Sequence, residues 1–145
     1  MPGQLSELSE GMALPEIKKD IIQENINLYA EASKDFNPIH IDEEFAGNTP
    51  LGGTIAHGML VLAYVSQMMT AAFGRNWLVA GKLDVRFRAP ARPGDIITVS
   101  GRVSKIVRNE DRILVICDVK CSNQTGDSII TGEARVEVKD SENSG

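Results

Sequence analysis

The feature that most constrains this chain is the apolar segment Met59–Phe73, which reads MLVLAYVSQMMTAAF and is followed by Gly74. The segment consists mostly of good helix formers, and a glycine directly after them is a helix stop signal. Because apolar residues occupy nearly every side of the predicted helix, we expect it to be buried and wrapped by a sheet. Polar residues interrupt it, and it is shorter than the roughly 20 residues of a membrane span, so we expect no membrane partner.

The chain after this helix has the character of strands. Charged and apolar residues alternate from Lys82 to Ala89, which is the period of a half-buried strand. Three further strands, separated by short turns, are predicted at Ile96–Val107, Arg112–Ser122 and Ser128–Val138. Gly101 lies inside the first of these three and predicts a bulge. A buried helix followed by consecutive strands favours the α+β class, with an antiparallel sheet around the helix.

The region before the helix is less regular. Glu16–Ile22 is predicted as a short strand, and Gln23–Ser33 has the apolar spacing of a short helix. The following stretch, Lys34–Thr54, contains an Asn-Pro pair and several glycines, which predict a long irregular loop. Long loops in small domains are often functional, so this stretch is the first place to look for a site.

Length and charge limit the classes of protein. The 145 residues predict one domain, residues 1–145, with a core of about 15–139 and loose polar ends at 1–10 and 140–145. The net charge of −5 argues against a nucleic-acid partner, because such proteins usually carry a basic excess. The first residues lack the basic and apolar regions of a secretory signal. We therefore expect a cytoplasmic protein.

The cysteines predict no disulfide. Cys117 and Cys121 are the only two in the chain, and they lie four residues apart in a predicted strand. That spacing places them on one face but about 13 Å apart, too far for a bridge. We interpret both as small buried apolar residues.

The chemistry-bearing residues gather around the irregular loop. Asp35 and His40 flank the turn at Asn37-Pro38, which can fold them toward each other. A carboxylate beside an imidazole fixes the tautomer of the ring and raises its basicity, so such a pair can hold and deprotonate a water. A structural role for both residues remains open, as does a plain turn role for Asn37. The residue set contains no recognisable zinc ligand pattern, so no metal is expected.

His57 and Gly58 stand where the loop becomes the helix. A backbone N–H at a helix N-terminus carries the positive end of the helix dipole and can stabilise a developing oxyanion. Gly58 would let a ligand approach that N–H closely, or it merely allows tight packing. His57 is interpreted as a packing or supporting residue. Ser66, inside the helix, is expected to bond back to its own helix rather than act as a nucleophile.

A local excess of cations follows the helix. Lys82, Arg86, Arg88 and Arg92 lie on or just after the first predicted strand of the sheet. They form either an ordinary solvated face or a site of attraction for an anionic group such as a phosphate.

Three segments of the sequence together carry a family resemblance. They are YAEASKDFNPIHID at residues 29–42, IAHGML at 55–60 and VRFRAPARPGD at 85–95. In this order and spacing, they resemble the MaoC-like hydratases, which include the (R)-specific enoyl-CoA hydratases and are similar to the catalytic subunit of (3R)-hydroxyacyl-ACP dehydratases. The resemblance covers about residues 15–139.

The resemblance implies a fold and a site. It implies the hot dog fold, an antiparallel sheet curled around one long helix, in chains that dimerise with the active site at their boundary. It implies that Asp35 and His40 are the catalytic dyad, that Asn37 supports their loop and that the Gly58 N–H binds the thioester carbonyl. Ser66 falls at the position of a helix serine associated with the site. Lys34 departs from the family pattern, which usually has glycine at this position.

The expected activity is reversible (R)-specific hydration of trans-2-enoyl thioesters to (3R)-hydroxyacyl thioesters. No metal or redox cofactor is expected, and the substrate is carried on coenzyme A or on the phosphopantetheine of acyl carrier protein. The expected assembly is a homodimer or higher homo-oligomer, or a heterodimer with a sister subunit. Two alternatives stay open: a hot-dog acyl-CoA thioesterase, and a subunit of a heterodimeric fatty-acid-elongation dehydratase.

Overall fold

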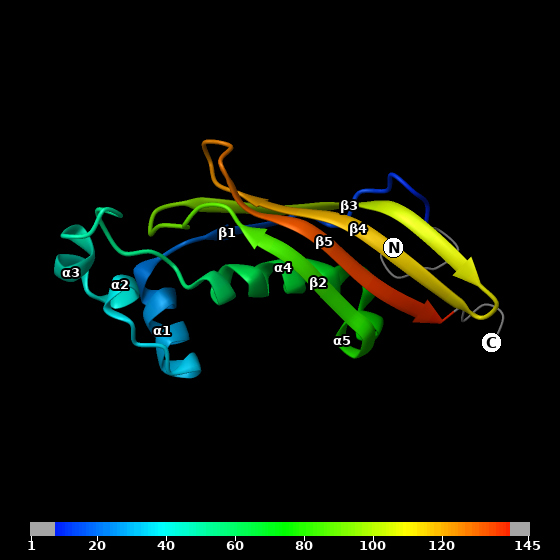
Figure 1. Cartoon of the computed structure of the whole chain (residues 1–145), viewed down its shortest axis with the longest axis horizontal. Helices are drawn as coiled ribbons and strands as arrows, with labels where there is room; N and C mark the ends of the chain where they lie inside the picture. The colour runs from blue at the N-terminus through cyan, green and yellow to red at the C-terminus, as the bar shows by residue number, and fades with distance from the viewer. Residues whose placement is uncertain (1–7, 140–145) are drawn as a thin grey trace.

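The computed structural model describes residues 8–139, which form one antiparallel sheet with helices (Figure 1). The sheet has five strands in the order β1-β3-β4-β5-β2. In chain order they are β1 (Ile17–Asp20), β2 (Gly81–Phe87), β3 (Ile96–Asn109), β4 (Arg112–Ser122) and β5 (Ser128–Lys139). The last three pair consecutively as hairpins, while β1 pairs with β3 and β2 pairs with β5 at the two edges.

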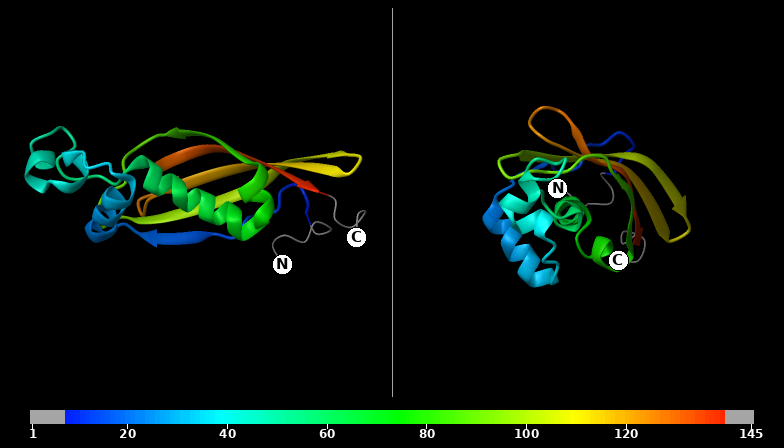
Figure 2. Two further views of the ribbon diagram at one scale, coloured as in Figure 1. Left: turned by 90° about the horizontal axis from the view of Figure 1, so that it is seen from below. Right: turned by 60° about the vertical axis from the view of Figure 1, so that its left-hand side comes forward.

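Five helices accompany the sheet. They are α1 (Gln23–Ser33), α2 (Pro38–Ile41), α3 (Glu43–Gly47), α4 (Gly58–Phe73) and α5 (Arg75–Ala80). The long helix α4 runs along one face of the curved sheet, α1 to α3 gather beyond one end of it, and α5 lies at the other end (Figure 2). This is the hot dog arrangement, and the α+β prediction is confirmed.

The helix α4 supplies the centre of the core through one of its faces. Val65, Met68 and Met69 are fully buried against the sheet, where they pack with inward residues of β3, β4 and β5. The opposite face is open in the single chain, and Met59 is 59% exposed. The prediction of a helix buried on every side is therefore wrong for one chain, because a single sheet covers one side only.

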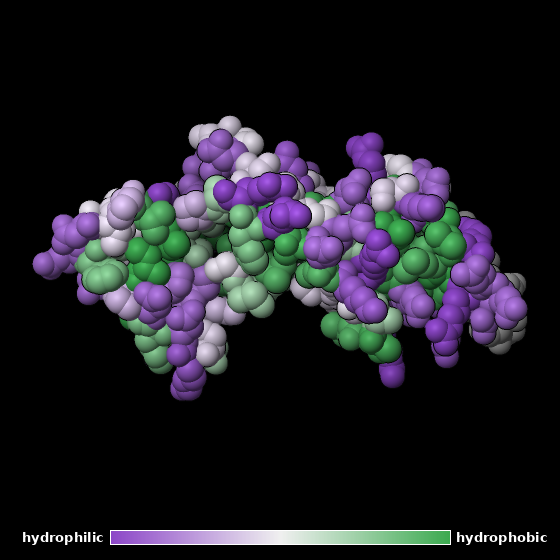
Figure 3. Space-filling model, in the orientation of Figure 1, coloured by the Kyte–Doolittle hydropathy of each residue, from purple (hydrophilic) through white to green (hydrophobic). Residues whose placement is uncertain are grey.

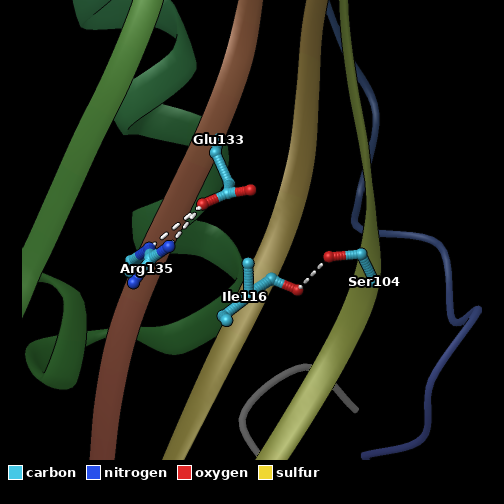
Figure 4. A network of polar contacts seen from close by, with 4 residues as sticks. All are labelled: Ser104, Ile116, Glu133 and Arg135. Carbon is cyan, nitrogen blue, oxygen red and sulfur yellow. Dashed lines mark hydrogen bonds and ion pairs between the residues drawn. The ribbon is translucent and has the colours of Figure 1, made fainter.

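The bulge in β3 lies at a different residue from the predicted one. Gly101 pairs regularly with Val119, and the register instead shifts between Val103 and Lys105. The extra residue is Ser104, whose hydroxyl donates to the Ile116 carbonyl at 3.0 Å (Figure 4). This bond gives the irregular ladder an additional polar contact.

Gly101 serves packing instead of curvature. A Cβ atom at this position would lie 3.0 Å from the Met68 methyl group and 2.9 Å from a methyl group of Leu14. The missing side chain lets α4 and the segment before β1 approach the sheet closely.

Most predicted elements are confirmed within one or two residues, and the structure adds three short helices that were not predicted. The stretch Lys34–Thr54, predicted as loop, contains the short helices α2 and α3, and the helix α5 was not predicted. Of the ends predicted to be loose, residues 1–7 and 140–145 lie outside the described residues. Leu8 is buried, and the Glu10 carboxylate accepts from the Ile106 N–H at 3.0 Å. Residues 8–10 are therefore packed against the sheet, and the prediction that they are loose is wrong.

The cysteine prediction is confirmed: both thiols are free and buried on β4. Burial raises the pKa of each thiol to about 12, and the neighbouring Asp118 carboxylate adds to this effect at Cys117. Within residues 8–139, no helix combines the length and the apolar character that crossing a membrane requires.

Candidate active site

The turn after α1 brings the first acidic residue into place. Lys34 ends α1 in the left-handed conformation, with φ 64° and ψ 21°. The chain then reverses, and Asp35 follows with its amide donating to the Ser33 hydroxyl at 3.3 Å. The glycine that the resemblance implies at this position would adopt a positive φ without steric cost, whereas lysine does not.

Asn37 organises the segment between Asp35 and His40. Its backbone N–H donates to the Asp35 carboxylate at 3.2 Å, and its side-chain oxygen accepts from the Ile39 N–H at 3.2 Å. The second contact caps α2, and Pro38 occupies the first position of that helix, where a missing N–H costs nothing. This one turn therefore sets both the Asp35 carboxylate and the start of the helix that carries His40.

His40 is held from both its ring and its backbone. The Nδ1 atom lies 2.9 Å from the Ile55 carbonyl oxygen, and since a carbonyl only accepts, Nδ1 carries the proton. The His40 carbonyl accepts from the Gln23 side chain at 2.7 Å. With Nδ1 committed, the lone pair of a neutral His40 is on Nε2, the nitrogen available for proton transfer.

His57 joins the two predicted residues. Its ring stacks on that of His40 with centroids 3.9 Å apart and planes tilted by 25°. Its Nε2 atom lies 3.0 Å from the Asp35 backbone oxygen. One potential ligand atom from each of Asp35, His40 and His57 can be chosen so that all three lie within 4.8 Å of one another. The structure thus brings Asp35 and His40 together and adds a second imidazole that sequence reasoning had treated only as support.

This cluster has donor types that suit a transition metal, although the sequence gave no ligand pattern. One nitrogen of each ring is bonded to a backbone carbonyl, so His40 Nε2 and His57 Nδ1 are the nitrogens that carry a lone pair.

Gly58 is the first residue of α4, directly after His57. As the first helical residue, it has no acceptor within the helix for its N–H. It lines a cavity of about 360 Å³ together with Ile55, Phe87 and Arg88, among others. A Cβ atom at Gly58 would lie 3.1 Å from the Phe87 ring, so glycine keeps this space open at the helix start. The cavity adjoins the site along the chain, because Ile55 also holds His40.

The structure does not bring Ser66 to this cluster. Ser66 lies eight residues beyond Gly58, or about 12 Å along the helix at 1.5 Å per residue. Its hydroxyl accepts from the Trp77 indole N–H at 2.8 Å, which joins α4 to α5. The predicted bond of this hydroxyl back to its own helix is replaced by that contact.

The four cations do not form one free basic face. Lys82 and Arg86 are exposed on β2, and Arg88, just after the strand, donates to the Thr131 hydroxyl at 2.9 Å and lines the cavity beside Gly58. Arg92 is engaged in the fold, because its guanidinium donates to the Leu51 carbonyl at 2.6 Å. Of the four, Arg88 is the one that shares the lining of this cavity with Gly58.

Sequence reasoning missed a second layer of support. The buried Thr54 donates its hydroxyl to the Gln23 side-chain oxygen at 2.7 Å, and the Gln23 amide in turn holds the His40 carbonyl. The Thr54 N–H donates to the Glu43 carboxylate at 3.2 Å. These contacts join residues 11 to 31 positions apart in types found on any surface, so no sequence pattern marks them.

The fold and this polar cluster at the start of the central helix define a hot-dog protein with a candidate acid–base site. The MaoC-like domain matches residues 8–125, and the chain belongs to this family of hydratases and dehydratases. The 3-hydroxybutyryl-CoA dehydratase of Methylorubrum extorquens is 35% identical over 123 residues, which are 84% of this chain and 76% of that protein.

Two further similarities lie in the same group. The (R)-specific enoyl-CoA hydratase of Rhodospirillum rubrum is 30% identical over 132 residues, covering 91% of this chain and 89% of that protein. The solved structure of an R-hydratase from Pseudomonas aeruginosa superposes with a TM-score of 0.78 at 29% identity, covering 90% of this chain and 82% of the other. The activities that these relatives are named for are those of hydro-lyases.

Proposed function

We propose that this protein catalyses the reversible (R)-specific hydration of trans-2-enoyl thioesters to (3R)-hydroxyacyl thioesters. The observation that carries the proposal is the convergence of the Asp35 carboxylate and the His40 imidazole beside a free helix N-terminus. This arrangement offers a proton acceptor, a proton donor and a stabiliser of negative charge, which are the three groups that water addition to a conjugated thioester requires.

The proposed reaction starts from one water held between Asp35 and His40. The water oxygen forms a bond to C3 of the substrate while the C2–C3 double bond opens, and one water proton passes to the Asp35–His40 pair. The pair returns a proton to C2 on the same face, so it ends the cycle unchanged. Asp35 and His40 act as a coupled pair, and the committed Nδ1–H of His40 leaves Nε2 for this transfer.

Gly58 supplies the third group. As C3 is attacked, electron density moves onto the thioester oxygen, and the Gly58 N–H at the head of the 16-residue helix α4 is proposed to bind that oxygen. The reaction as proposed uses no metal or redox cofactor. The thioester is carried on coenzyme A or acyl carrier protein, and Arg88 is the proposed contact for its phosphates.

The assembly is proposed to be a homodimer. The open face of α4 and the exposed apolar residues Phe36, Ile41 and Phe45 near the site leave apolar surface that a second copy would cover. Sedimentation equilibrium of the chain expressed alone is expected to give twice the chain mass. A stable active monomer, or activity that needs a different subunit, would contradict this assembly.

The test of the activity measures loss of the enoyl absorbance of crotonyl-CoA, longer enoyl-CoAs and enoyl-acyl carrier protein. An (R)-specific dehydrogenase reads the product. Asp35→Asn and His40→Ala are each expected to lower kcat by about 10²–10⁴-fold, the usual contribution of a positioned acid or base. Asp111→Asn makes the same chemical change at an exposed turn and is expected to retain wild-type activity.

Three results would overturn the proposal. The first is absence of hydration by the folded wild type with every substrate in the panel. The second is thiol release without hydration, which would indicate a thioesterase. The third is full activity in both the Asp35 and the His40 variants, which would overturn the assignment of the catalytic residues but not the reaction itself.

A further inference from the structure

We infer that His57 is a positioning residue that holds both members of the dyad, and that it does so as a neutral ring in the tautomer opposite to that of His40. The inference rests on the proposed function for its kinetic consequence, but the geometry can be tested without any substrate. Its basis is that His57 contacts Asp35 through one edge and His40 through one face.

The contact with Asp35 is a backbone anchor. The Asp35 carbonyl accepts from His57 Nε2 at 3.0 Å, and a carbonyl oxygen has no proton to give, so Nε2 is the protonated nitrogen. Asp35 itself is exposed and follows the strained turn at Lys34. The ring of a buried residue, 3% exposed, therefore fixes the main chain from which the exposed carboxylate projects.

The contact with His40 is a stack. The His57 ring contacts two other rings, with the His40 centroid at 3.9 Å and the Tyr29 centroid at 4.8 Å. Tyr29 comes from α1 and His40 from α2, so His57 joins both helices to the start of α4. The ring plane of His40 then has two constraints, the stack and the Nδ1–H bond to Ile55.

The second ring nitrogen of His57, Nδ1, explains why this ring is neutral. His57 Nδ1 is buried and has no hydrogen-bond partner among residues 8–139. A protonated ring would place a second N–H there without an acceptor, which is costly in a buried position. The neutral Nε2–H tautomer leaves only a lone pair unpaired, and it is the form that the contact with Asp35 requires. His40 carries its proton on Nδ1, so the two neighbouring rings adopt opposite tautomers.

The chain offers a direct spectroscopic test, because it contains only two histidines. Two-bond ¹H–¹⁵N spectra of the untagged protein at neutral pH distinguish Nδ1–H from Nε2–H rings. We expect one ring of each kind. The His57→Phe variant leaves His40 as the single remaining signal, which assigns the spectrum. A wild-type spectrum with His57 as the Nδ1–H tautomer, or with His57 charged at neutral pH, would overturn the inference.

Two variants separate the two contacts. His57→Gln keeps an amide N–H near the place of Nε2 and loses the stack, while His57→Phe keeps the stack and loses the donor. Each is expected to lower kcat by about 10- to 100-fold, because small misplacements of reacting groups have effects of this size. The KM of each is expected to stay within about threefold of wild type, since His57 is not proposed to touch the substrate.

Thermal unfolding of each variant shows whether it folds, and only folded variants are compared. A folded variant with unchanged kcat, or one in which KM rises while kcat holds, would overturn the positioning role. The tautomer spectrum separates this failure from that of the proposed function. If wild type lacks hydratase activity but shows opposite tautomers, the proposed function fails and the geometry of His57 stands.

Discussion

Lys34 adopts a left-handed backbone conformation although it carries a Cβ atom, which makes it the most strained residue in the candidate site. For an L-residue this conformation costs about 1–2 kcal/mol relative to the right-handed one. The strain is located directly before Asp35, and the network around Asn37 and His57 maintains the turn despite it. The residue shows that the site's geometry is set by tertiary contacts rather than by the local preference of the chain.

Replacing this lysine with glycine is therefore expected to stabilise the protein. Lys34→Gly should raise the free energy of unfolding by about 0.5–1 kcal/mol, because relief of the strained φ exceeds the extra freedom of glycine in the unfolded chain. Urea unfolding monitored by circular dichroism measures it. Lys34→Ala removes the same charge but keeps the strain, so a gain of equal size in that variant would contradict the explanation.

The individual site residues were predictable to different degrees. The sequence predicted a turn with acid–base chemistry from the order Asp35, Asn37, Pro38, His40. Asn37 caps α2, as expected of a turn residue. The stack of His57 on His40 was not predictable, because it depends on how the start of α4 meets α2. The hydrogen bond between Gln23 and Thr54 was not predictable either, because it joins residues 31 positions apart in the chain.

Among the elements, β5 contains a glycine whose neighbours leave no room for a side chain. A Cβ at Gly132 would lie 2.4 Å from the Asp84 carbonyl oxygen and 2.6 Å from the Val85 Cα, both on the edge strand β2. Because backbone atoms cannot move aside as a flexible side chain can, β2 must shift as a whole to admit even a methyl group. Attachment of this edge strand thus depends on one glycine.

Gly132→Ala is accordingly expected to lower the free energy of unfolding by about 1–3 kcal/mol, the usual cost of overpacking. Gly47→Ala is the matched control, since nothing lies within 4 Å of its missing Cβ and its φ is not positive. The control is expected to be neutral or slightly stabilising. Thermal unfolding of both variants measures the difference, and equal effects would show that crowding by β2 is not the cause.

Periodicity predicted the regular elements well and failed where elements are short. The strands β2 to β5 and the helices α1 and α4 were found because alternation and apolar spacing persist over several residues. The helix α5 has only six residues and follows Gly74, the signal that ends α4. Gly101 was misread as a bulge because a glycine in a strand marks either a bulge or a close approach, and sequence does not distinguish them.

At the scale of the whole molecule, the candidate site and α5 lie at opposite ends of α4 (Figure 2). The candidate site lies where α4 begins, beyond which α1 to α3 extend from the sheet (Figure 1). Apolar side chains show at the surface over both ends (Figure 3). Leu78 and Val79 of α5 are exposed apolar residues. The outer face of the sheet is polar in part, with the Glu133–Arg135 ion pair at 3.0 Å (Figure 4).

The buried cysteines couple the stability of the whole domain to alkaline pH. The thiol pKa of Cys117 and Cys121 is raised from an ordinary value of 9.0 to about 12 in the folded protein. Their contribution to stability is therefore fully present below pH 9, where both states hold the proton, and is lost as the pH rises from 9 toward 12. Above pH 9 the unfolded chain releases thiol protons that the folded chain retains.

The free energy of unfolding, measured by urea unfolding, is expected to fall between pH 9 and pH 10.5, by at most about 1.4 kcal/mol per pH unit for each thiol. The double variant Cys117→Ala, Cys121→Ala is expected to show a shallower fall, although it starts from a lower stability because the smaller side chains leave space in the core. Identical slopes in the two proteins would indicate that other groups, and not the thiols, govern the alkaline loss.

The bond between Trp77 and Ser66 makes α5 an optical reporter of the core. Trp77 is the chain's single tryptophan, it is buried, and its indole N–H donates at 2.8 Å to Ser66, which lies halfway along α4. Its fluorescence should shift to the red when the helix detaches and water reaches the ring, while a ligand bound near Gly58 leaves the emission unchanged. Tryptophan fluorescence therefore reports the packing of α5 against α4 independently of ligand binding at Gly58.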